Sequence, residues 1–322
     1  MKILFVYKNF STFVENDYNI LKKHFDVSTF HYGKDSLLKL PKLVKKSNLV
    51  YIWFASKHAL IPTGYAKKNN KKLVIVSGGY DVAKVKMPHG YYGLMSSRKT
   101  SWMPKYILNR ADKILCVSKS NMKQTELVTS NPNIELIYNG VDTKKFDCLV
   151  DTEKQNIVIT VATLDKTSWY HKGIDLFIQS ASKVSTEDVK FFVIGKHSNF
   201  SKKQLLTIKN NKLDFTGYLS DEELLDFYCK SKVYCQFSRH ESFGVSVAEA
   251  MLCNCHPIVT NSYALPEVIG NQGFIVSFSN PNFSEVIEKA LDTPLKDYRS
   301  RIKEQFSLKQ REKQLVEVIK DL

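Results

Sequence analysis

The sequence has no apolar run long enough to span a membrane and no segment typical of a secretion signal. One of its longest apolar runs, LVYIWFA at residues 49–55, is far shorter than the roughly 20 residues that a spanning helix requires. The first residues, MKILFVYKNF, contain a short apolar core that predicts a first strand and not a signal peptide. Repeats of solenoid length and low-complexity tracts are absent as well. We therefore expect a globular protein in the cytoplasm.

Cysteines are few and follow no framework spacing. There are six of them: Cys116, Cys148, Cys229, Cys235, Cys253 and Cys255. Several lie in apolar segments, as Cys116 does in ILCVS, which predicts buried free thiols in a reducing compartment. Cys253 and Cys255 stand beside His256, but no second pair of ligands follows at the interval that zinc sites use. The sequence therefore predicts no metal site.

Apolar residues and basic charge, by contrast, are plentiful. The chain has 322 residues, of which 43% are hydrophobic, enough to bury the cores of two domains of about 150 residues each. Its formal net charge is +15, which bears on partners and not on fold. The charge favours an anionic membrane surface, an anionic donor or a nucleic acid as a partner. The plainer interpretation is a lysine-rich solvated surface, as the run at residues 67–72 would form.

Short β-rich runs alternate with longer amphipathic segments in two blocks of the chain. This alternation predicts an α/β fold with two parallel sheets and crossover helices. In the first block the predicted strands are residues 3–6, 27–30, 49–54, 73–76, 114–117 and 134–137, and the predicted helices are 13–25, 37–44, 57–68, one ending near 110, and 122–128 after Ser118 or Ser120. In the second block the predicted strands are 157–161, 191–194, 213–215, 233–237, 257–260 and 274–278, and the predicted helices are 174–184, one capped by Ser220, and one or two within 283–322.

The blocks meet near an Asn-Gly turn in NGVDTKKF, residues 139–146, which a polar stretch follows. We predict an N-terminal domain at residues 1–150 and a C-terminal domain at residues 151–300. The remaining residues, 301–322, are expected to form a C-terminal helix that packs back toward the N-terminal domain.

Residues 239–270 contain the side chains and the turn that are most typical of a ligand-binding site. Glu241 directly follows a predicted strand, and in open α/β sheets ligands bind beyond the carboxyl ends of the strands. Gly244 permits a tight turn and a close approach of the backbone. The helix that begins there would offer unpaired amide groups to a phosphate, and Glu249, about one turn further on, could accept sugar hydroxyls. For either carboxylate alone, an ordinary cap or a surface charge is the simpler interpretation.

These residues stand in HESFGVSVAEAM, which resembles the E-x7-E signature of retaining glycosyltransferases of family 4. The run FTGYLSDEELLDFYCKSKVYCQFSR before it and YALPEVIG after it resemble the same family. So do NGVDTKKF at the inter-domain turn, HKGIDLFIQS at a helix start and ADKILCVSKS near the end of the first block. The resemblance covers the second block almost completely and the first only in patches.

The resemblance implies two Rossmann-like domains that face each other across a cleft, which is the GT-B fold. It also implies a nucleotide-diphosphate sugar as donor, with no metal or other cofactor required. Glu249 would then bind the donor ribose and Glu241 the transferred sugar. Lys172 would pair with the diphosphate and stabilise the leaving group.

The family also suggests where the rest of the donor binds. Ser242, Phe243 and Gly244 would contact its sugar or phosphate, mainly through backbone amides. Tyr218 and Leu219, directly after Gly217, occupy the position at which the family holds the base.

The sequence departs from the family pattern at three places. Thr163 stands where the family has an arginine that assists the lysine at the diphosphate, and Lys166 or His171 is the candidate replacement. Residues 8–12 replace the usual glycine-rich loop after the first strand, and Asn254 occupies a position that is commonly glycine.

In the first block, SGGYD at residues 77–81 resembles the family's loop that faces the acceptor and the donor sugar. Asp81 and His89 are therefore candidate catalytic residues. The alternatives are a plain turn aspartate for Asp81 and an exposed Pro-His-Gly turn for His89. His240, next to Glu241, either lines the site or only ends the strand.

These observations together predict a retaining hexosyltransferase that uses a glycan, a protein glycan or a lipid-linked sugar as acceptor. The basic charge adds a peripheral place on the inner face of an anionic membrane, through Lys42, Lys45, Lys46 and the aromatic-basic run at residues 91–106. Two alternatives stay open. One is a GT-B glucosyltransferase that acts on nucleic acid, which the lack of a base-reading motif disfavours. The other is a non-catalytic nucleotide-sugar binder, suggested by Thr163.

Overall fold

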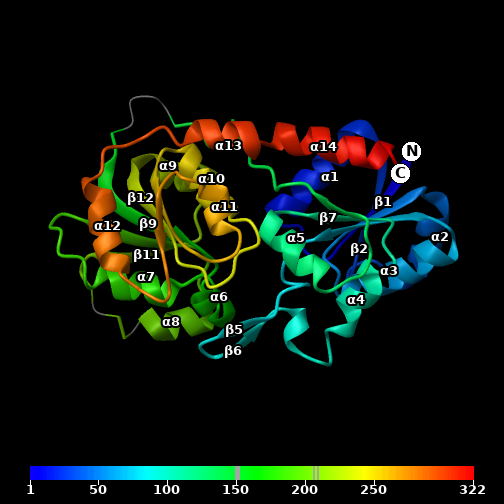
Figure 1. Ribbon diagram of the computed structural model, residues 1–322, viewed down its shortest axis with the longest axis horizontal. Coiled ribbons are helices and arrows are strands. Elements are labelled where there is room, and N and C mark those ends of the chain that lie inside the picture. Colours follow the sequence, from blue (N-terminus) through cyan, green and yellow to red (C-terminus); the bar gives the residue numbers. More distant parts are fainter. Residues whose placement is uncertain (149–152, 206, 209) are drawn as a thin grey trace. The chain divides into compact units, whose positions relative to one another are not determined.

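The computed structural model describes residues 1–148, 153–205, 207–208 and 210–322 (Figure 1). The chain forms two compact units. Unit 1 comprises Met1–Lys86, Gly90–Gly140 and Leu308–Leu322, and unit 2 comprises Met87–His89 and Val141–Ser307. The predicted boundary between residues 150 and 151 lies outside the described residues. In the described part of the chain, no helix is long and apolar enough to cross a membrane.

Unit 1 is built on a six-stranded parallel sheet, with strand order β2-β1-β3-β4-β7-β8. All six strands predicted in the first block are confirmed, with ends that shift by one or two residues. They are β1 (Lys2–Tyr7), β2 (Asp26–His31), β3 (Leu49–Trp53), β4 (Lys72–Ser77), β7 (Lys113–Cys116) and β8 (Ile134–Leu136). The inner strand β3 is buried along its whole length, because helices cover both faces of a parallel sheet.

The helices of unit 1 lie in two layers, one on each face of its sheet. They are α1 (Thr12–His24), η1 (Leu37–Lys39), α2 (Leu40–Lys46), α3 (Lys57–Lys68), η2 (Leu94–Ser96), α4 (Trp102–Leu108), α5 (Lys119–Glu126) and α14 (Leu308–Lys320). Right-handed crossovers put α1 on one face and α2, α3 and α4 on the other, since the chain reverses direction after β2. Helix α14 packs beside α1. A small hairpin of β5 (Val85–Met87) and β6 (Gly90–Tyr92) follows β4 and was not predicted.

A buried ion pair fixes α14 to the rest of unit 1. Arg311 is 2% exposed, and its Nε and Nη2 atoms lie 2.5 and 2.7 Å from the two carboxylate oxygens of Asp17, which is fully buried on α1. Tyr51 and Trp53 also donate hydrogen bonds to Asp17, at 2.6 and 2.8 Å. Arg311 further donates to the carbonyl oxygens of Ile137 and Tyr138. Every polar atom of the pair thus has a partner, which a buried charge requires.

Unit 2 contains a second six-stranded parallel sheet, in the order β11-β10-β9-β12-β13-β14. Its strands confirm the six predicted in the second block: β9 (Gln155–Val161), β10 (Lys190–Ile194), β11 (Leu213–Gly217), β12 (Ser231–Gln236), β13 (His256–Thr260) and β14 (Phe274–Val276). The order 3-2-1-4-5-6 is that of a dinucleotide-binding Rossmann sheet, and it reverses between β9 and β12. The predicted α/β class with two Rossmann-like parallel sheets is confirmed.

Eight helices of unit 2 are α6 (Lys166–His171), α7 (Ile174–Ala181), α8 (Asn199–Leu205), α9 (Asp221–Lys230), α10 (Val245–Leu252), α11 (Leu265–Ile269), α12 (Phe283–Asp292) and α13 (Arg299–Gln305). Ser220 caps α9 as predicted and forms a capping box with Glu223. The loop expected before Gly173 contains α6 instead, which Asp165 caps. The tail predicted as one or two helices forms three, because Pro294 and an extended turn separate α12 from α13 and Ser307 separates α13 from α14.

The prediction of six free thiols is wrong for two of them. Cys148 and Cys229 form a disulfide across 81 residues of sequence, whereas the other four cysteines are free and buried. The segment before Cys148 runs along α9, where Phe146 contacts the ring of Tyr228 and Lys145 pairs with Asp221. This long-range packing brings the two sulfur atoms together, and no local spacing could have revealed it.

Candidate functional site

The site in unit 2 begins where its sheet reverses direction. The chain leaves the carboxyl ends of β9 and β12 toward opposite sides, and in open α/β sheets such a reversal marks the crevice in which ligands bind. The segment after β9 leads through α6 to Lys172 and Gly173. The segment after β12 carries His240, Glu241 and the turn before α10. Two segments that are far apart in the sequence therefore border one crevice.

Lys172 and Glu241 meet at this crevice. Lys172 Nζ lies 2.5 Å from Glu241 Oε2, and the two side chains are 28% and 13% exposed. Burial alone would raise the pKa of the Glu241 carboxyl, but the charge of the Lys172 ammonium and its hydrogen bond outweigh burial and lower that pKa. Glu241 is therefore ionised at neutral pH. The pair presents one cation and one carboxylate that a bound ligand can separate.

A second ion pair holds the Lys172 turn in place. Arg239 forms a bidentate pair with Asp175 at 2.9 and 2.7 Å, and it also donates to the carbonyl oxygen of Tyr170. The backbone N–H of Arg239 donates to the carbonyl of His171. Gly173 adopts a φ of +71°, and a Cβ atom there would lie 2.0 Å from the Phe237 carbonyl oxygen. These contacts fix Lys172 against the end of β12. The Arg239–Asp175 pair joins two segments far apart in the sequence, so neither motif nor spacing indicated it.

The turn before α10 supplies backbone amides. Gly244 caps the helix with a φ of +98°, and a Cβ atom there would come within 3.0 Å of Leu265. The amides of Val245 and Ser246, the first two helical residues, have no acceptor within the helix and can bind an anion, whereas Val247 already donates to the Gly244 carbonyl oxygen. The ring of Phe243 is buried against Phe306, which leaves only its backbone for the ligand. Ser242 is half-buried, and its backbone N–H donates to Glu241 Oε1 at 3.3 Å.

Glu249 lies one turn further along α10 and is buried. Tyr228 on α9 donates a hydrogen bond to Glu249 Oε2 at 3.1 Å. Burial raises the pKa of Glu249 to about 7, although the hydrogen bond from Tyr228 acts in the opposite direction. This carboxyl therefore changes charge near neutral pH. Tyr228 is a functional candidate that the sequence did not reveal, because the contact joins two helices.

Two buried histidines line the same region. His171 and His240 stack with ring centroids 5.9 Å apart, and His240 also contacts the ring of Tyr263. Burial and the Lys172 charge lower the pKa of His171 to about 3. Burial lowers the pKa of His240 to about 4. Both rings are therefore neutral at pH 7, which argues against His171 as a cationic substitute for the missing arginine.

The other donor-site predictions fall on exposed or half-buried positions at the same edge of the sheet. Tyr218, which is 79% exposed, and half-buried Leu219 follow β11, two strands from β9. Thr163 is exposed just after β9, and Lys166 is exposed in the first turn of α6. These positions suit a ligand that extends along the carboxyl ends of β9, β10 and β11.

The two candidates from the first block differ in their surroundings. Asp81 is fully buried in unit 1, where its carboxylate oxygens accept hydrogen bonds from the N–H groups of Ala55 and Gly79, at 2.8 and 2.9 Å. It thus ties the turn after β3 to the turn after β4. His89 is exposed and belongs to unit 2, where its ring lies 4.4 Å from that of Tyr170. Their predicted catalytic roles stay predictions.

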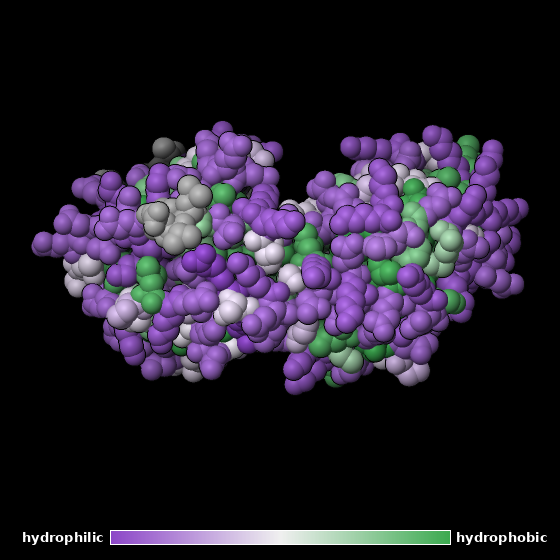
Figure 2. All heavy atoms as spheres, turned by 90° about the horizontal axis from the view of Figure 1, so that it is seen from above, coloured by the Kyte–Doolittle hydropathy of each residue, from purple (hydrophilic) through white to green (hydrophobic). Residues whose placement is uncertain are grey.

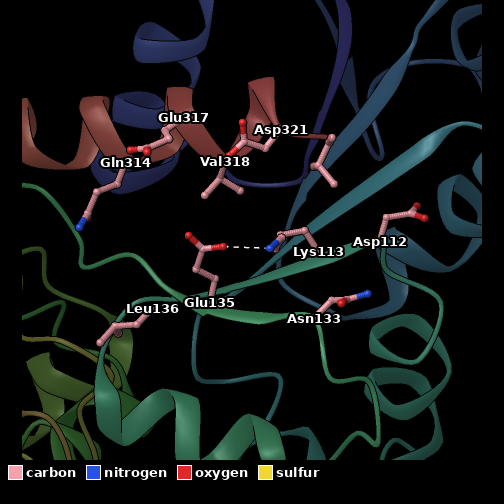
Figure 3. A pocket seen from close by; sticks show the side chains of 10 residues that line it. Asp112, Lys113, Asn133, Glu135, Leu136, Gln314, Glu317, Val318 and Asp321 are labelled. Carbon is pink, nitrogen blue, oxygen red and sulfur yellow. Dashed lines mark hydrogen bonds and ion pairs between the residues drawn. The ribbon is translucent and has the colours of Figure 1, made fainter.

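A pocket of about 440 Å³ in unit 1 lies beside the edge strand β8 and below α14 (Figure 3). Four carboxylates line it, on Asp112, Glu135, Glu317 and Asp321, together with Lys113, which pairs with Glu135. Their charge would repel a diphosphate, so this pocket is no candidate for the donor.

In the part of the chain that the structure describes, the one cluster with metal-ligand spacing is Cys148, Cys229 and Cys253. The first two of these are joined by the disulfide. His256, which stands beside Cys255 in the sequence, has partners at both ring nitrogens, Tyr298 and the Thr293 carbonyl.

Comparisons with known proteins bear on the family and the fold of this chain. The model of the family described as "Glycosyl transferases group 1" matches residues 142–307. An uncharacterized glycosyltransferase of Methanocaldococcus jannaschii is 30% identical over 203 residues, which is 62% of this chain and 54% of the relative. The phosphatidylinositol N-acetylglucosaminyltransferase GPI3 subunit of Saccharomyces cerevisiae is 29% identical over 236 residues, with 64% and 50% covered. The chain thus spans about half the length of these relatives.

Among solved structures, Anabaena Alr3699/HepE in complex with UDP has a TM-score of 0.81, 15% sequence identity and full coverage of both chains. At that identity the likeness concerns the fold.

Proposed function

Because this chain belongs to the glycosyl transferases group 1 family, we propose that it moves a sugar from a nucleotide-diphosphate sugar to an acceptor hydroxyl, with retention of configuration at the anomeric carbon. The observation that carries the proposal is the Lys172–Glu241 pair at the strand reversal of unit 2, directly before the amide-rich start of α10. A cation and free amides suit a diphosphate, and carboxylates suit sugar hydroxyls.

Each residue has a role in this proposal. The donor diphosphate replaces Glu241 as the ion-pair partner of Lys172 and lies against the amides of Gly244 and the first turn of α10. Glu241 then accepts hydrogen bonds from hydroxyls of the transferred sugar, and Glu249 accepts them from the ribose. Tyr218 and Leu219 flank the base. Lys166 supplies a second cation in place of the arginine that Thr163 replaces.

The transfer step follows from this arrangement. The bond between the anomeric carbon and the β-phosphate oxygen breaks, while the acceptor oxygen bonds to the same face of that carbon. The acceptor proton passes to the departing phosphate, and Lys172 and the helix amides stabilise the charge that develops there. In unit 1, Asp81 positions the turns after β3 and β4. His89 is exposed and remains the candidate to assist removal of the proton.

The proposal extends to the acceptor and to the place of action. The relative from yeast is named for transfer to phosphatidylinositol, a lipid. We place this protein on the cytoplasmic face of a membrane, with a lipid-linked sugar or another glycan as acceptor and no metal required.

A thermal-shift screen against UDP-, GDP-, ADP- and dTDP-sugars tests the proposal. A donor present at about 100 times its Kd should raise the unfolding temperature by about 5 °C. Transfer of a labelled sugar from that donor to a glycolipid or oligosaccharide should follow. Binding without turnover on any acceptor would favour the non-catalytic alternative, whereas no binding of any donor would contradict both.

Donor affinity should depend on pH through Glu249. Only the ionised carboxylate accepts two ribose hydroxyls, and the pKa of about 7 leaves it mostly protonated at lower pH. The Kd of the nucleotide sugar should therefore be about tenfold higher at pH 6 than at pH 8, in proportion to the competent fraction. The measurement should use the intact nucleotide sugar, because the terminal phosphate of a free nucleoside diphosphate itself titrates near pH 6.

Two variants identify the titrating group. Glu249→Gln should bind more weakly at all pH values and lose the dependence on pH. Tyr228→Phe removes a hydrogen bond that lowers the pKa of Glu249, so the transition should move to higher pH. A transition that persists unchanged in Glu249→Gln would show that another group is responsible.

A further inference from the structure

The basic charge of this protein is concentrated in one part of unit 1. Residues 36–111 contain 15 lysine and arginine side chains but a single acidic one, Asp81, and so carry +14 of the formal net charge of +15. Asp81 is fully buried, so it adds no negative charge to the surface. In the described part of the chain, Lys67 is the only one of the 15 with an acidic partner, Asp112.

This stretch contains three neighbouring helices on one face of the sheet. Helix α2 packs beside α3, and α3 beside α4, on the face opposite α1 and α14 (Figure 1). Exposed basic side chains occur on all three, including Lys42, Lys45, Lys57, Lys68 and Lys105. We call the exposed side of η1, α2, α3 and α4 the basic face.

Large apolar side chains project from the same elements. Leu38 in η1 is 90% exposed and Leu37 is 46% exposed. Ile61 on α3 and Trp102 on α4 are 40% and 51% exposed. Burying such side chains is favourable, and leaving several exposed on adjacent elements marks an interaction surface. By contrast, the side onto which Figure 2 looks, where α14 lies, is mostly hydrophilic.

We propose that the basic face binds a bilayer of anionic phospholipids, with lysines against the headgroups and Leu37, Leu38, Ile61 and Trp102 inserted at the interface. The combination of basic and apolar side chains favours a bilayer over a nucleic acid as the partner. Unpaired lysines without competing acids attract an anionic surface, and exposed leucine and tryptophan side chains gain by entering the boundary between headgroups and acyl chains. A nucleic acid would use the lysines but would leave Leu38 without an apolar environment. This inference rests on the membrane location proposed above, but not on turnover.

Cosedimentation with vesicles tests the inference without any donor present. The wild type should bind vesicles containing about 30% phosphatidylglycerol, bind pure phosphatidylcholine far more weakly, and lose most binding as salt rises toward about 1 M. The triple variant Lys39→Gln/Lys42→Gln/Lys45→Gln should bind the anionic vesicles about a hundredfold more weakly. Leu37→Ser/Leu38→Ser should weaken binding about tenfold at constant charge.

A matched variant tests whether vesicle binding depends on the basic face itself or only on the total charge of the protein. Lys183, Lys202 and Lys203 are exposed lysines of unit 2, and their replacement by Gln removes the same three charges. This triple variant should bind within about threefold of the wild type, and so should Glu249→Ala, which alters the donor site alone. Equal losses in both lysine triples, no preference for anionic vesicles, or tighter binding to duplex DNA than to vesicles would each overturn the inference. Vesicle binding that fails while sugar transfer persists would refute this inference and leave the proposed function standing.

Discussion

Replacing Lys172 by alanine is expected to lower kcat for sugar transfer by about 10²- to 10³-fold. Lys172 pairs with Glu241, four residues before α10 begins, and the proposed chemistry needs it to stabilise the departing diphosphate. The loss should appear in kcat as well as in KM, because the charge on the leaving group is largest in the transition state. Initial rates with the donor selected by the screen would measure both constants.

The control for this variant is another paired lysine in the same unit. Lys230 pairs with Asp226 at 2.7 Å on the surface of α9, so Lys230→Ala removes a similar ion pair away from the crevice. It should retain kcat within about twofold, since exposed pairs contribute little. Unchanged turnover in a folded Lys172→Ala protein would refute the assigned role.

Replacing Arg311 by alanine is expected to lower the free energy of unfolding by about 3–5 kcal/mol. The change leaves Asp17 as a buried carboxylate without its cation, and it frees the carbonyl oxygens of Ile137 and Tyr138. Helix α14 would lose its main polar attachment within unit 1. Urea unfolding followed by tryptophan fluorescence suits the measurement, because the indole of Trp53 donates to Asp17.

Two further variants test whether the unpaired Asp17 charge causes the loss of stability in Arg311→Ala. Glu312 on the same helix pairs with His24 and Lys23 at the surface, so Glu312→Ala should change the unfolding free energy by less than about 1 kcal/mol. The double variant Asp17→Leu/Arg311→Met removes both charges and should recover part of the lost stability, because Tyr51 and Trp53 still lose their acceptor. If the double variant were as unstable as Arg311→Ala, packing volume and not the unpaired charge would explain the effect.

Much of the fold could be predicted from the sequence, because the relevant signals are local. Apolar runs such as LVYIW between polar turns predict buried parallel strands, and all six strands of each sheet were predicted. Ser220 followed by Asp-Glu-Glu predicts a helix start that the structure confirms. The short helix α6 was missed because Trp169 and Tyr170 weaken a helical pattern of only six residues.

The contacts that organise the site could be predicted only in part. Motif resemblance indicated that Lys172, Glu241 and Glu249 serve one ligand, and the structure brings Lys172 and Glu241 into contact. The bidentate pair of Arg239 with Asp175, and the hydrogen bond from Tyr228 to Glu249, join elements far apart in the sequence. So does the disulfide between Cys148 and Cys229. Such contacts depend on how helices pack onto a sheet, which periodicity and spacing do not specify.

Calorimetric titration of the selected nucleotide-diphosphate sugar into the wild type and Glu249→Ala at pH 8 tests the central claim most directly. Glu249 is buried beside Tyr228 and is proposed to hold the ribose, so its loss should raise the Kd at least about 100-fold, as expected when two hydrogen bonds to a charged group are removed. The control Glu285→Ala, on the exposed side of α12, should bind as the wild type does. Equal affinity of Glu249→Ala and the wild type would contradict the account.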